Sequence, residues 1–297
     1  MSQHALVFVA PPDDKPAYRE ALLMLGRVAL NRKLPPPSVL SGWESAEWIY
    51  ESVDGELRQE AAATVAELPV DWALVPVEGR RKKLLVADMD STIINVECLD
   101  ELADFAGIKA EIAAITEQAM RGELEFEPAL RARVAKLKGL ALDALQKTYD
   151  ERVRLNPGAA TLVRTMAAHG ARCVLVSGGF SFFTSRVASA AGFHADRANT
   201  LLDDGATLTG LVQEPILGRA AKLEALRSEA QAIGAFDRDA LAIGDGANDL
   251  DMIKAAGLGI AYRAKPVVAA EADAKIDYTN LEAALFFQGY RRGEFAL

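Results

Sequence analysis

Four short apolar runs in the second part of the chain most strongly constrain its fold. Helical segments separate the runs, which are Leu84 to Ala87, Cys173 to Val176, Ala240 to Ile243 and Leu258 to Ala261, with a shorter one near Ile276. Uniformly apolar strands joined by helices are typical of a parallel sheet that is covered on both faces. We therefore expect an α/β core with a parallel sheet, over residues 81–297.

Polar clusters follow three of these runs at the point where each run ends. The first cluster contains Asp88 and Asp90, the second begins with Ser177 and Gly178, and the third is GDGANDLD, which contains Asp245, Asn248 and Asp249. Ligands of open parallel sheets bind outside the carboxyl ends of the strands. The three clusters are therefore expected to meet at one edge of the sheet.

These residue types suit phosphoryl transfer. A carboxylate can attack phosphorus and so divide hydrolysis into formation and breakdown of an aspartyl phosphate, while a second carboxylate two residues on exchanges protons with the leaving alkoxide and with water. Such carboxylates repel a phosphate unless a cation lies among them, and oxygen ligands including Asp245 suit Mg²⁺. Lys222 could neutralise further charge, and Ser177 could hydrogen-bond the phosphoryl oxygens.

Each cluster alone has a plainer interpretation. An Asp-x-Asp pair is commonly a cap or a turn, Ser-Gly-Gly is commonly a loop, and GDGANDLD could be a turn or a weak calcium-like loop. Neither glycine-containing cluster fits the GxGxxG dinucleotide fingerprint. Their occurrence together, each at the end of a buried-strand pattern and with a lysine between the second and third, favours a single site.

Taken jointly, DMDST, VLVSGGF, Lys222 and IGDGANDLDM resemble the motifs of the haloacid dehalogenase superfamily, and in particular its phosphoserine phosphatase branch, over about residues 84–285. The resemblance implies a Rossmann-like core, with Asp88 as nucleophile and Asp90 as acid and base. The same resemblance implies Mg²⁺ held by Asp88, the backbone carbonyl of Asp90 and Asp245. It also implies that Asn248 and Asp249 support the metal and phosphate site. The implied activity is hydrolysis of phosphoserine, the last step of serine biosynthesis.

About 85 residues separate the first two apolar runs, far more than one crossover helix requires, and residues 98–150 are helical in composition. We expect an inserted helical cap that selects the substrate. Phosphoserine carries an ammonium and a carboxylate, which an acid and an arginine would meet. Glu97 and Arg133 match the spacing of the phosphoserine phosphatases, and Met120 and Phe126 match the apolar wall of their pocket.

Read without the family, these cap residues have other interpretations. Glu97 could be an acid at a helix N-terminus, and Arg133 could be a solvated partner of Glu125 or Glu127. Met120 and Phe126 could be core residues. Two other activities also stay open: transfer of the phosphoryl group to another alcohol such as homoserine, and hydrolysis of another small phosphoester. A binding protein without activity is disfavoured, because none of the expected catalytic positions is missing.

Residues 1–80 are predicted to form a small separate α+β domain. Strand-like segments at Ala5 to Ala10, Ala46 to Val53 and Trp72 to Val77 alternate with two helical patterns, of which the second runs from Leu57 to Leu68. This order resembles an ACT-like or ferredoxin-like domain, in which a further strand should lie near Ser38 to Leu40. Such a domain could sense an amino acid or form a homodimer, or it could simply cover the catalytic domain.

Composition excludes several classes of protein. The net charge of −9 disfavours a nucleic-acid binder, and no apolar stretch is long enough to span a bilayer. The N-terminus lacks the features of a secretory signal, so a cytoplasmic location is expected. Cys98 and Cys173 are far apart in the sequence and fit buried thiols better than a disulfide or a zinc site.

An Asp-Gly turn at Asp204 predicts a hairpin between 200–202 and 207–212.

Overall fold

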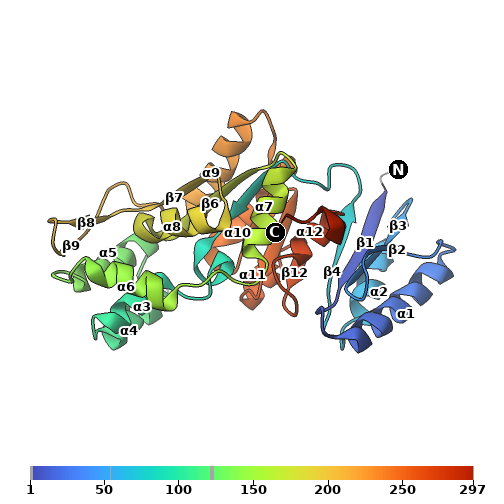
Figure 1. Ribbon diagram of the computed structural model, residues 1–297, viewed down its shortest axis with the longest axis horizontal. Coiled ribbons are helices and arrows are strands. Elements are labelled where there is room, and N and C mark those ends of the chain that lie inside the picture. Colours follow the sequence, from blue (N-terminus) through green and yellow to red (C-terminus); the bar gives the residue numbers. More distant parts are fainter. Residues whose placement is uncertain (1–2, 54, 121–123, 297) are drawn as a thin grey trace.

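The computed structural model describes residues 3–53, 55–120 and 124–296. A small sheet formed by the N-terminal residues lies at one end of the long axis, a larger sheet occupies the middle, and a group of helices lies at the other end (Figure 1). No helix within the described residues is long and apolar enough to cross a membrane. Both cysteines, Cys98 and Cys173, are buried and free, as predicted.

The central sheet has six strands, and every neighbouring pair is parallel. Its order is β12-β11-β10-β5-β6-β7, with β5 at Leu84–Ala87, β6 at Arg172–Phe180, β7 at Ala195–Asn199, β10 at Ala240–Gly244, β11 at Leu258–Tyr262 and β12 at Ala274–Ile276. The predicted parallel sheet is confirmed. Strand β6 continues beyond Val176 through the Ser-Gly-Gly cluster, and β7 was not predicted because its sequence, ADRAN, is polar and lies at the sheet edge.

Helices cover both faces of this sheet, which explains why its inner strands β5, β10 and β11 are apolar. Alternate residues of β5 enter two different core clusters: Leu85 and Ala87 join one, while Leu84 and Val86 join the other. The surrounding helices are α7 (Ala159–Ala168), α8 (Ser181–Ala191), α9 (Arg219–Ala232), α10 (Leu250–Ala255), α11 (Pro266–Ala269) and α12 (Ala283–Phe287). Because both faces of the inner strands β5, β10 and β11 are covered, these strands are apolar and the polar side chains lie beyond their ends.

The strand order places a topological switch point between β5 and β10. From β5 the chain continues to β6 and β7 on one side, and later strands β10, β11 and β12 extend the other side. The Asp88 N–H donates to the Ile243 carbonyl at 3.0 Å, so the segments that leave these two strands begin side by side. A crevice for ligands opens at such a switch point.

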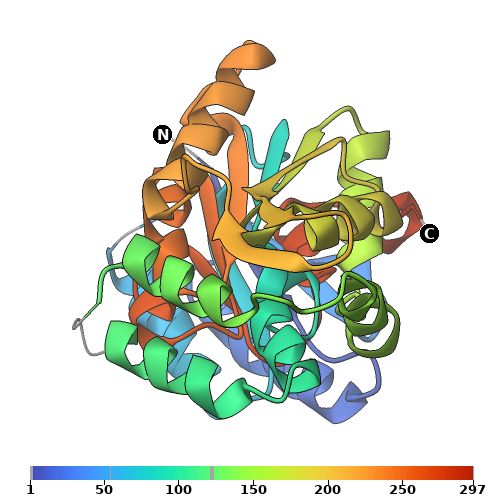
Figure 2. The same cartoon turned by 90° about the vertical axis from the view of Figure 1, so that its left-hand side faces the viewer.

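The expected helical insertion lies between β5 and β6. It comprises α3 (Cys98–Phe105), α4 (Lys109–Met120), α5 (Phe126–Lys136) and α6 (Asp143–Arg152). The predicted hairpin is also present, as β8 (Leu201–Asp203) and β9 (Leu208–Val212). Its Leu208 exchanges backbone hydrogen bonds of 2.8 Å with Gly139 and Leu140 in the α5–α6 connection, so the hairpin lies against the cap (Figure 2).

The N-terminal residues form an antiparallel sheet of order β2-β3-β1-β4. The elements are β1 (His4–Val9), α1 (Lys15–Asn31), β2 (Ser38–Ser41), β3 (Ser45–Tyr50), α2 (Gly55–Thr64) and β4 (Asp71–Pro76), which is the ferredoxin-like order. The strand expected near Ser38 is therefore β2. Helix α2 ends at Thr64 rather than Leu68, because the last apolar residues of the pattern are buried in a turn instead.

Both faces of this N-terminal sheet are covered. Leu6, Phe8 and Trp48 pack beneath α1 and α2 in a cluster of their own. On the other face, Val7 and Val75 belong to the same apolar cluster as Phe287 of α12, which lies between the two sheets (Figure 1). The apolar core of the molecule therefore continues from the central sheet into the N-terminal one.

Asp71 of β4 makes a buried polar connection from the N-terminal sheet to the turn after β12. Its side chain is 3% exposed, and its Oδ1 accepts from the N–H groups of Asp277 at 2.8 Å and Tyr278 at 3.2 Å. Its Oδ2 accepts from the Thr279 N–H at 2.9 Å and from the Thr279 hydroxyl at 2.5 Å. Burial raises the pKa of this carboxyl, and the four hydrogen bonds oppose that rise. One carboxylate thus accepts hydrogen bonds from the backbone N–H groups of all three residues in the turn that follows β12.

We predict that Asp71→Ala lowers the free energy of unfolding by about 3 kcal/mol, because it leaves buried backbone N–H groups without an acceptor. Urea unfolding followed by circular dichroism measures the change. Asp13→Ala, at an exposed carboxylate of the same N-terminal part, is the control and should shift stability by about 0.5 kcal/mol or less. Equal effects of the two substitutions would contradict this role for Asp71.

Candidate active site

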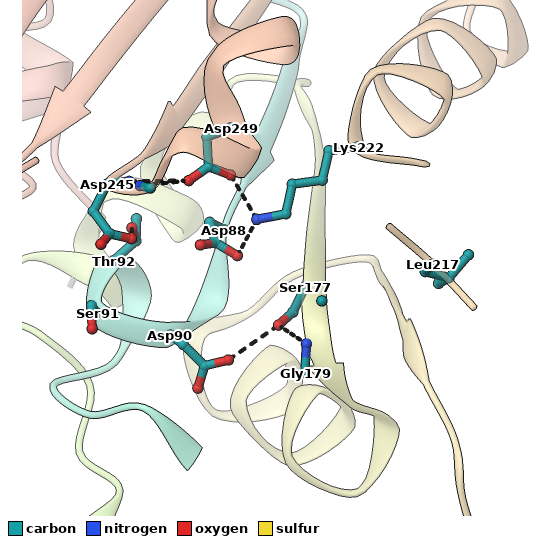
Figure 3. A network of polar contacts seen from close by, with 12 residues as sticks. Asp88, Asp90, Ser91, Thr92, Ser177, Gly179, Leu217, Lys222, Asp245 and Asp249 are labelled. Atoms are coloured by element: carbon teal, nitrogen blue, oxygen red, sulfur yellow. Dashed lines mark hydrogen bonds and ion pairs between the residues drawn. The ribbon is translucent and has the colours of Figure 1, made fainter. Parts of the chain in front are cut away.

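Three carboxylates meet at the switch point of the central sheet. Asp88 follows β5, Asp245 follows β10, and Asp249 ends the short helix η3 (Ala247–Asp249) (Figure 3). One oxygen from each lies within 4.8 Å of the others. Lys222 of α9 extends between two of them, with its Nζ 2.5 Å from Asp88 Oδ1 and 2.6 Å from Asp249 Oδ1. The first and third predicted clusters therefore meet here, together with Lys222.

The charges of this group are only partly balanced. Burial and the neighbouring Asp249 raise the pKa of Asp88 well above its ordinary value, against the opposing effect of Lys222. Burial, followed by Asp249 and Glu97, raises the pKa of Asp245 to about 6. For Lys222, burial lowers the pKa, but the two flanking carboxylates outweigh it and raise the pKa above its usual range. One ammonium cannot balance the charge of three carboxylates, so this group can accept a second cation.

The donor set fits a hard divalent cation. Carboxylate oxygens are the ligands that Mg²⁺ and Ca²⁺ prefer, and neither histidine nor cysteine belongs to the cluster of Asp88, Asp245 and Asp249. Asp249 is itself held in place, because its Oδ2 accepts from the N–H groups of Asp245 at 3.2 Å and Gly246 at 3.0 Å. Asp90, expected to contribute a backbone carbonyl, has its side chain outside this carboxylate cluster.

The Asp90 carboxyl lies in a second group of polar contacts, in the turn η1 (Met89–Ile93). Its Oδ1 accepts from the Cys98 N–H at 2.9 Å, and its Oδ2 accepts from the Ser177 hydroxyl at 3.2 Å (Figure 3). Burial, followed by the charge of Glu97, raises the pKa of Asp90 to about 7. A carboxyl that exchanges its proton near neutrality is suited to general acid and base catalysis.

Glycine allows Asp90 and Ser177 to approach. The Ser177 hydroxyl also accepts from the Gly179 N–H at 2.8 Å. A Cβ atom at Gly179 would lie 2.8 Å from Asp90 Oδ2 and 3.0 Å from Ser177 Oγ, which is closer than side chains normally pack. The Ser-Gly-Gly cluster is thus a close-packed part of the site.

The cap brings an aromatic side chain to the strand ends. The half-buried Phe126 of α5 lies against two glycines of the core, since a Cβ at Gly178 would be 3.3 Å from its ring and a Cβ at Gly218 would be 3.5 Å from it. Met120 ends α4, and its side chain lies outside the described residues. Phe126 is therefore a contact between cap and core.

The two charged residues expected to recognise the substrate are also near the site. Glu97 is exposed, and its Oε1 accepts from the Ser91 hydroxyl at 2.6 Å. Arg133 is half-buried, and its Nε donates to the Ala129 carbonyl at 3.3 Å. Burial lowers the pKa of Arg133, while Asp100 and Glu97 oppose that change, and the guanidinium forms no ion pair with a described residue. The remaining N–H groups of the Arg133 guanidinium thus have no carboxylate partner among the described residues.

Two further residues contact the site and were missed in the sequence. The Thr92 hydroxyl donates to Asp245 Oδ1 at 3.1 Å, and Asn199, at the end of β7, binds the Gly178 carbonyl at 2.9 Å. Thr92 lies within the first cluster and could have been named from it. No sequence motif marks Asn199, and the strand that positions it, β7, was not predicted. The predicted Asn248 lies half-buried in η3, beside Gly246.

The fold and the site define a hydrolase of the phosphatase class, and comparisons with known proteins agree. The sequence pattern of the haloacid dehalogenase-like hydrolases matches residues 85–254. A phosphoserine phosphatase from Polaromonas sp. is 47% identical over 208 residues, which cover 68% of this chain and 88% of that protein.

Two crystal structures extend the similarity to nearly the whole chain. A haloacid dehalogenase family hydrolase from Salmonella enterica serovar Typhi has a TM-score of 0.84 at 28% identity, over 97% of this chain and 98% of that one. A probable phosphoserine phosphatase from Vibrio cholerae has a TM-score of 0.77 at 31% identity, over 96% and 86% of the two chains. The chain belongs to the haloacid dehalogenase-like hydrolase family, and it is an enzyme, a phosphatase.

We predict that Gly179→Ala lowers kcat by on the order of 100-fold, because the added methyl group displaces Asp90 or Ser177 and misplaced groups cost about that much. Steady-state phosphate release measures the loss. Gly293→Ala is the control, since a Cβ there meets open space. Unchanged kcat in Gly179→Ala would show that the close approach of Asp90 and Ser177 is unimportant for turnover.

Proposed function

We propose that this enzyme hydrolyses O-phospho-L-serine to L-serine and phosphate in a Mg²⁺-dependent reaction, the last step of serine biosynthesis. The observation that carries the proposal is the arrangement of Asp88 and Asp90 on one turn, with Lys222 at Asp88 and Ser177 at Asp90. Relatives named phosphoserine phosphatases support the choice of substrate. Arg133 and Glu97, in and beside the cap, supply the charges that an amino acid requires.

The proposed reaction has two steps. An Asp88 oxygen attacks phosphorus and forms an O–P bond, the bond between phosphorus and the serine oxygen breaks, and Asp90 gives its proton to that oxygen. Asp90 then takes a proton from a water molecule whose oxygen attacks the aspartyl phosphate, which releases phosphate and restores Asp88. Ser177, the Gly178 backbone and Lys222 bind the phosphoryl oxygens.

The metal, when bound, would neutralise phosphoryl charge beside the carboxylates. We propose that Asp88, Asp245 and the Asp90 backbone carbonyl would hold it. Asp249 and Asn248 would support that group, since Asp249 already accepts from the backbone of the Asp245 loop. Three acids around one lysine would bind a phosphate dianion poorly without such a cation.

In the proposed pocket, the cap recognises the amino-acid part of the substrate. Glu97 would bind the ammonium, and Arg133 would bind the carboxylate through guanidinium donors that no described carboxylate occupies. Phe126 and Met120 would form the apolar wall. A phosphoester whose alcohol part carries no charge would leave both Glu97 and Arg133 without partners, and this difference is the basis for selection.

Two alternatives use the same intermediate or the same core. If homoserine rather than water attacked the aspartyl phosphate, the enzyme would be a phosphotransferase. Phosphohomoserine formed from phosphoserine in the presence of homoserine would support that reaction, which motifs and geometry leave open. Hydrolysis of another small phosphoester would need only the core groups and not Arg133.

The N-terminal part, residues 1–80, is proposed to be a domain whose role is to cover α12. The burial of its inner sheet face against Phe287 and its neighbours supports a cover. Amino-acid sensing and homodimer formation through this domain stay predictions. Removal of residues 1–80 would distinguish them, because loss of a sensor spares turnover whereas loss of a cover exposes apolar surface.

Phosphate release from phosphoserine and from a panel of other phosphoesters tests the proposal, with Mg²⁺ and with excess chelator. We expect a strong Mg²⁺-dependent preference for phosphoserine, and no turnover by a folded Asp88→Asn variant, since an amide does not replace the nucleophile. Similar rates on all esters would contradict the substrate assignment. Appreciable activity of Asp88→Asn would contradict the assignment of the nucleophile.

We further predict that Arg133→Ala raises KM for phosphoserine by on the order of 100-fold and changes KM for a phosphoester without a carboxylate about twofold or less, because a charge-assisted contact is worth about 2–3 kcal/mol. Arg131→Ala is the matched control on the same helix. Its exposed guanidinium already pairs with Glu127 and Glu214. Equal effects on both substrates would remove Arg133 from carboxylate recognition.

A further inference from the structure

One buried side chain outside the proposed chemistry connects two of its loops. Asn199 ends β7 and is 2% exposed. Its Nδ2 donates to the Gly178 carbonyl at 2.9 Å and to the Leu217 carbonyl at 3.3 Å, and its Oδ1 accepts from the Leu217 N–H at 2.7 Å. All of these partners are backbone groups, so the amide fixes main-chain positions on both sides.

The first partner belongs to the Ser-Gly-Gly cluster. The Gly178 carbonyl and the Gly179 N–H are two ends of the same peptide group. Asn199 binds the carbonyl end, and the N–H end donates to the Ser177 hydroxyl at 2.8 Å. Because a peptide group is planar, holding its oxygen also sets the direction of its N–H. The orientation of the Ser177 hydroxyl therefore depends on a peptide that Asn199 holds.

The second partner leads directly into the helix that carries Lys222. Leu217 precedes Gly218, which is the N-cap residue of α9, and Lys222 lies in the first turns of that helix. Both the N–H and the carbonyl of Leu217 are bound to Asn199, so the entry of α9 is held at a fixed distance from Gly178. Figure 3 shows Leu217 on the far side of Ser177 and Gly179 from Asp90.

The separation of these two segments also determines a contact with the cap. Phe126 lies against Gly178, whose carbonyl Asn199 binds, and against Gly218, which follows Leu217. If the two segments moved apart, the ring would lose one of its two contacts. The amide thus sets the spacing of three elements: the Ser-Gly-Gly loop, the start of α9 and the surface on which Phe126 rests.

We propose that Asn199 is a positioning residue that holds Ser177 and Lys222 at the spacing needed to bind the transferring phosphoryl group. The inference rests on the proposed roles of those two residues. Asn199 acts through the backbone and touches no reacting atom. An amide is required because only it offers a donor for the two carbonyls and an acceptor for the N–H in one short planar group.

The test compares Asn199→Ala with Gln288→Ala. Gln288 is the matched control because it is another buried amide that joins backbone groups, donating to the Ala284 carbonyl at 3.0 Å and accepting from the Lys82 N–H at 3.0 Å. Lys82 lies just before β5, at the opposite end of that strand from Asp88. Both variants should unfold at lower temperature than the parent. Only Asn199→Ala should lose kcat, by on the order of 10- to 100-fold on the best ester of the panel.

Two readouts, kcat and inhibition by phosphate, separate positioning from general loss of structure. In Asn199→Ala, the inhibition constant for inorganic phosphate should rise, because Ser177 and Lys222 are no longer held at the spacing that binds the phosphoryl group, whereas in Gln288→Ala it should stay within about twofold. An equal loss of kcat in Gln288→Ala, or unchanged phosphate inhibition in Asn199→Ala, would overturn the inference. If Asn199→Ala does not fold, Asn199→Ser replaces it under the same criteria.

A double-mutant cycle with Ser177→Ala identifies the path. If Asn199 acts through Ser177, the double variant should lose less activity than the product of the two single losses. A loss equal to that product would overturn the path through Ser177. Full activity of Ser177→Ala alone would overturn the proposed phosphate site and this inference with it, whereas loss in Ser177→Ala with normal kcat in Asn199→Ala would overturn only the role of Asn199.

Discussion

The ammonium of Lys222 between Asp88 and Asp249 is the interaction on which the site depends. All three groups are almost completely removed from water, with side-chain exposures of 3%, 7% and 0%. Moving charges out of water costs several kcal/mol per ion, and the attraction between them offsets this cost only when the geometry is good. Contacts of 2.5 Å and 2.6 Å to two carboxylates meet that condition. The lysine therefore allows Asp88 and Asp249 to lie close together at the ends of the strands.

That cluster in turn requires a backbone that comes very close to the acids. A Cβ atom at Gly244 would lie 2.3 Å from the Asp249 side chain, so no other residue could end β10 without moving that carboxylate. Gly179 has the same relation to Asp90 on the other side of the site. Gly244 and Gly179 are thus required for a steric reason, since the absence of a side chain leaves space for a carboxylate.

The sequence allowed the central sheet and its polar edge to be predicted, because strands buried on both faces must be apolar and their ends must carry the polar groups. Strand β7 escaped this argument, since an edge strand of sequence ADRAN has no apolar pattern. Asn199 was missed for the same reason. Its role depends on contacts with residues 178 and 217, which lie on different elements and share no local sequence signal. The end of α2 was wrong because apolar spacing continued into a buried turn.

The N-terminal part is connected to the site through the backbone of the central sheet. Asp71 holds the turn at residues 277–279, and the Arg263 guanidinium donates to the Thr279 carbonyl at 3.3 Å. Two residues further on, the Lys265 N–H donates to the Asp245 carbonyl at 3.1 Å. The segment after β11 therefore contacts the turn that Asp71 holds on one side and the loop that carries Asp245 on the other. Helix α12 separately buries apolar surface against the N-terminal sheet. The hydrogen bonds that begin at Asp71 therefore reach, through Thr279 and the segment after β11, the loop that carries Asp245.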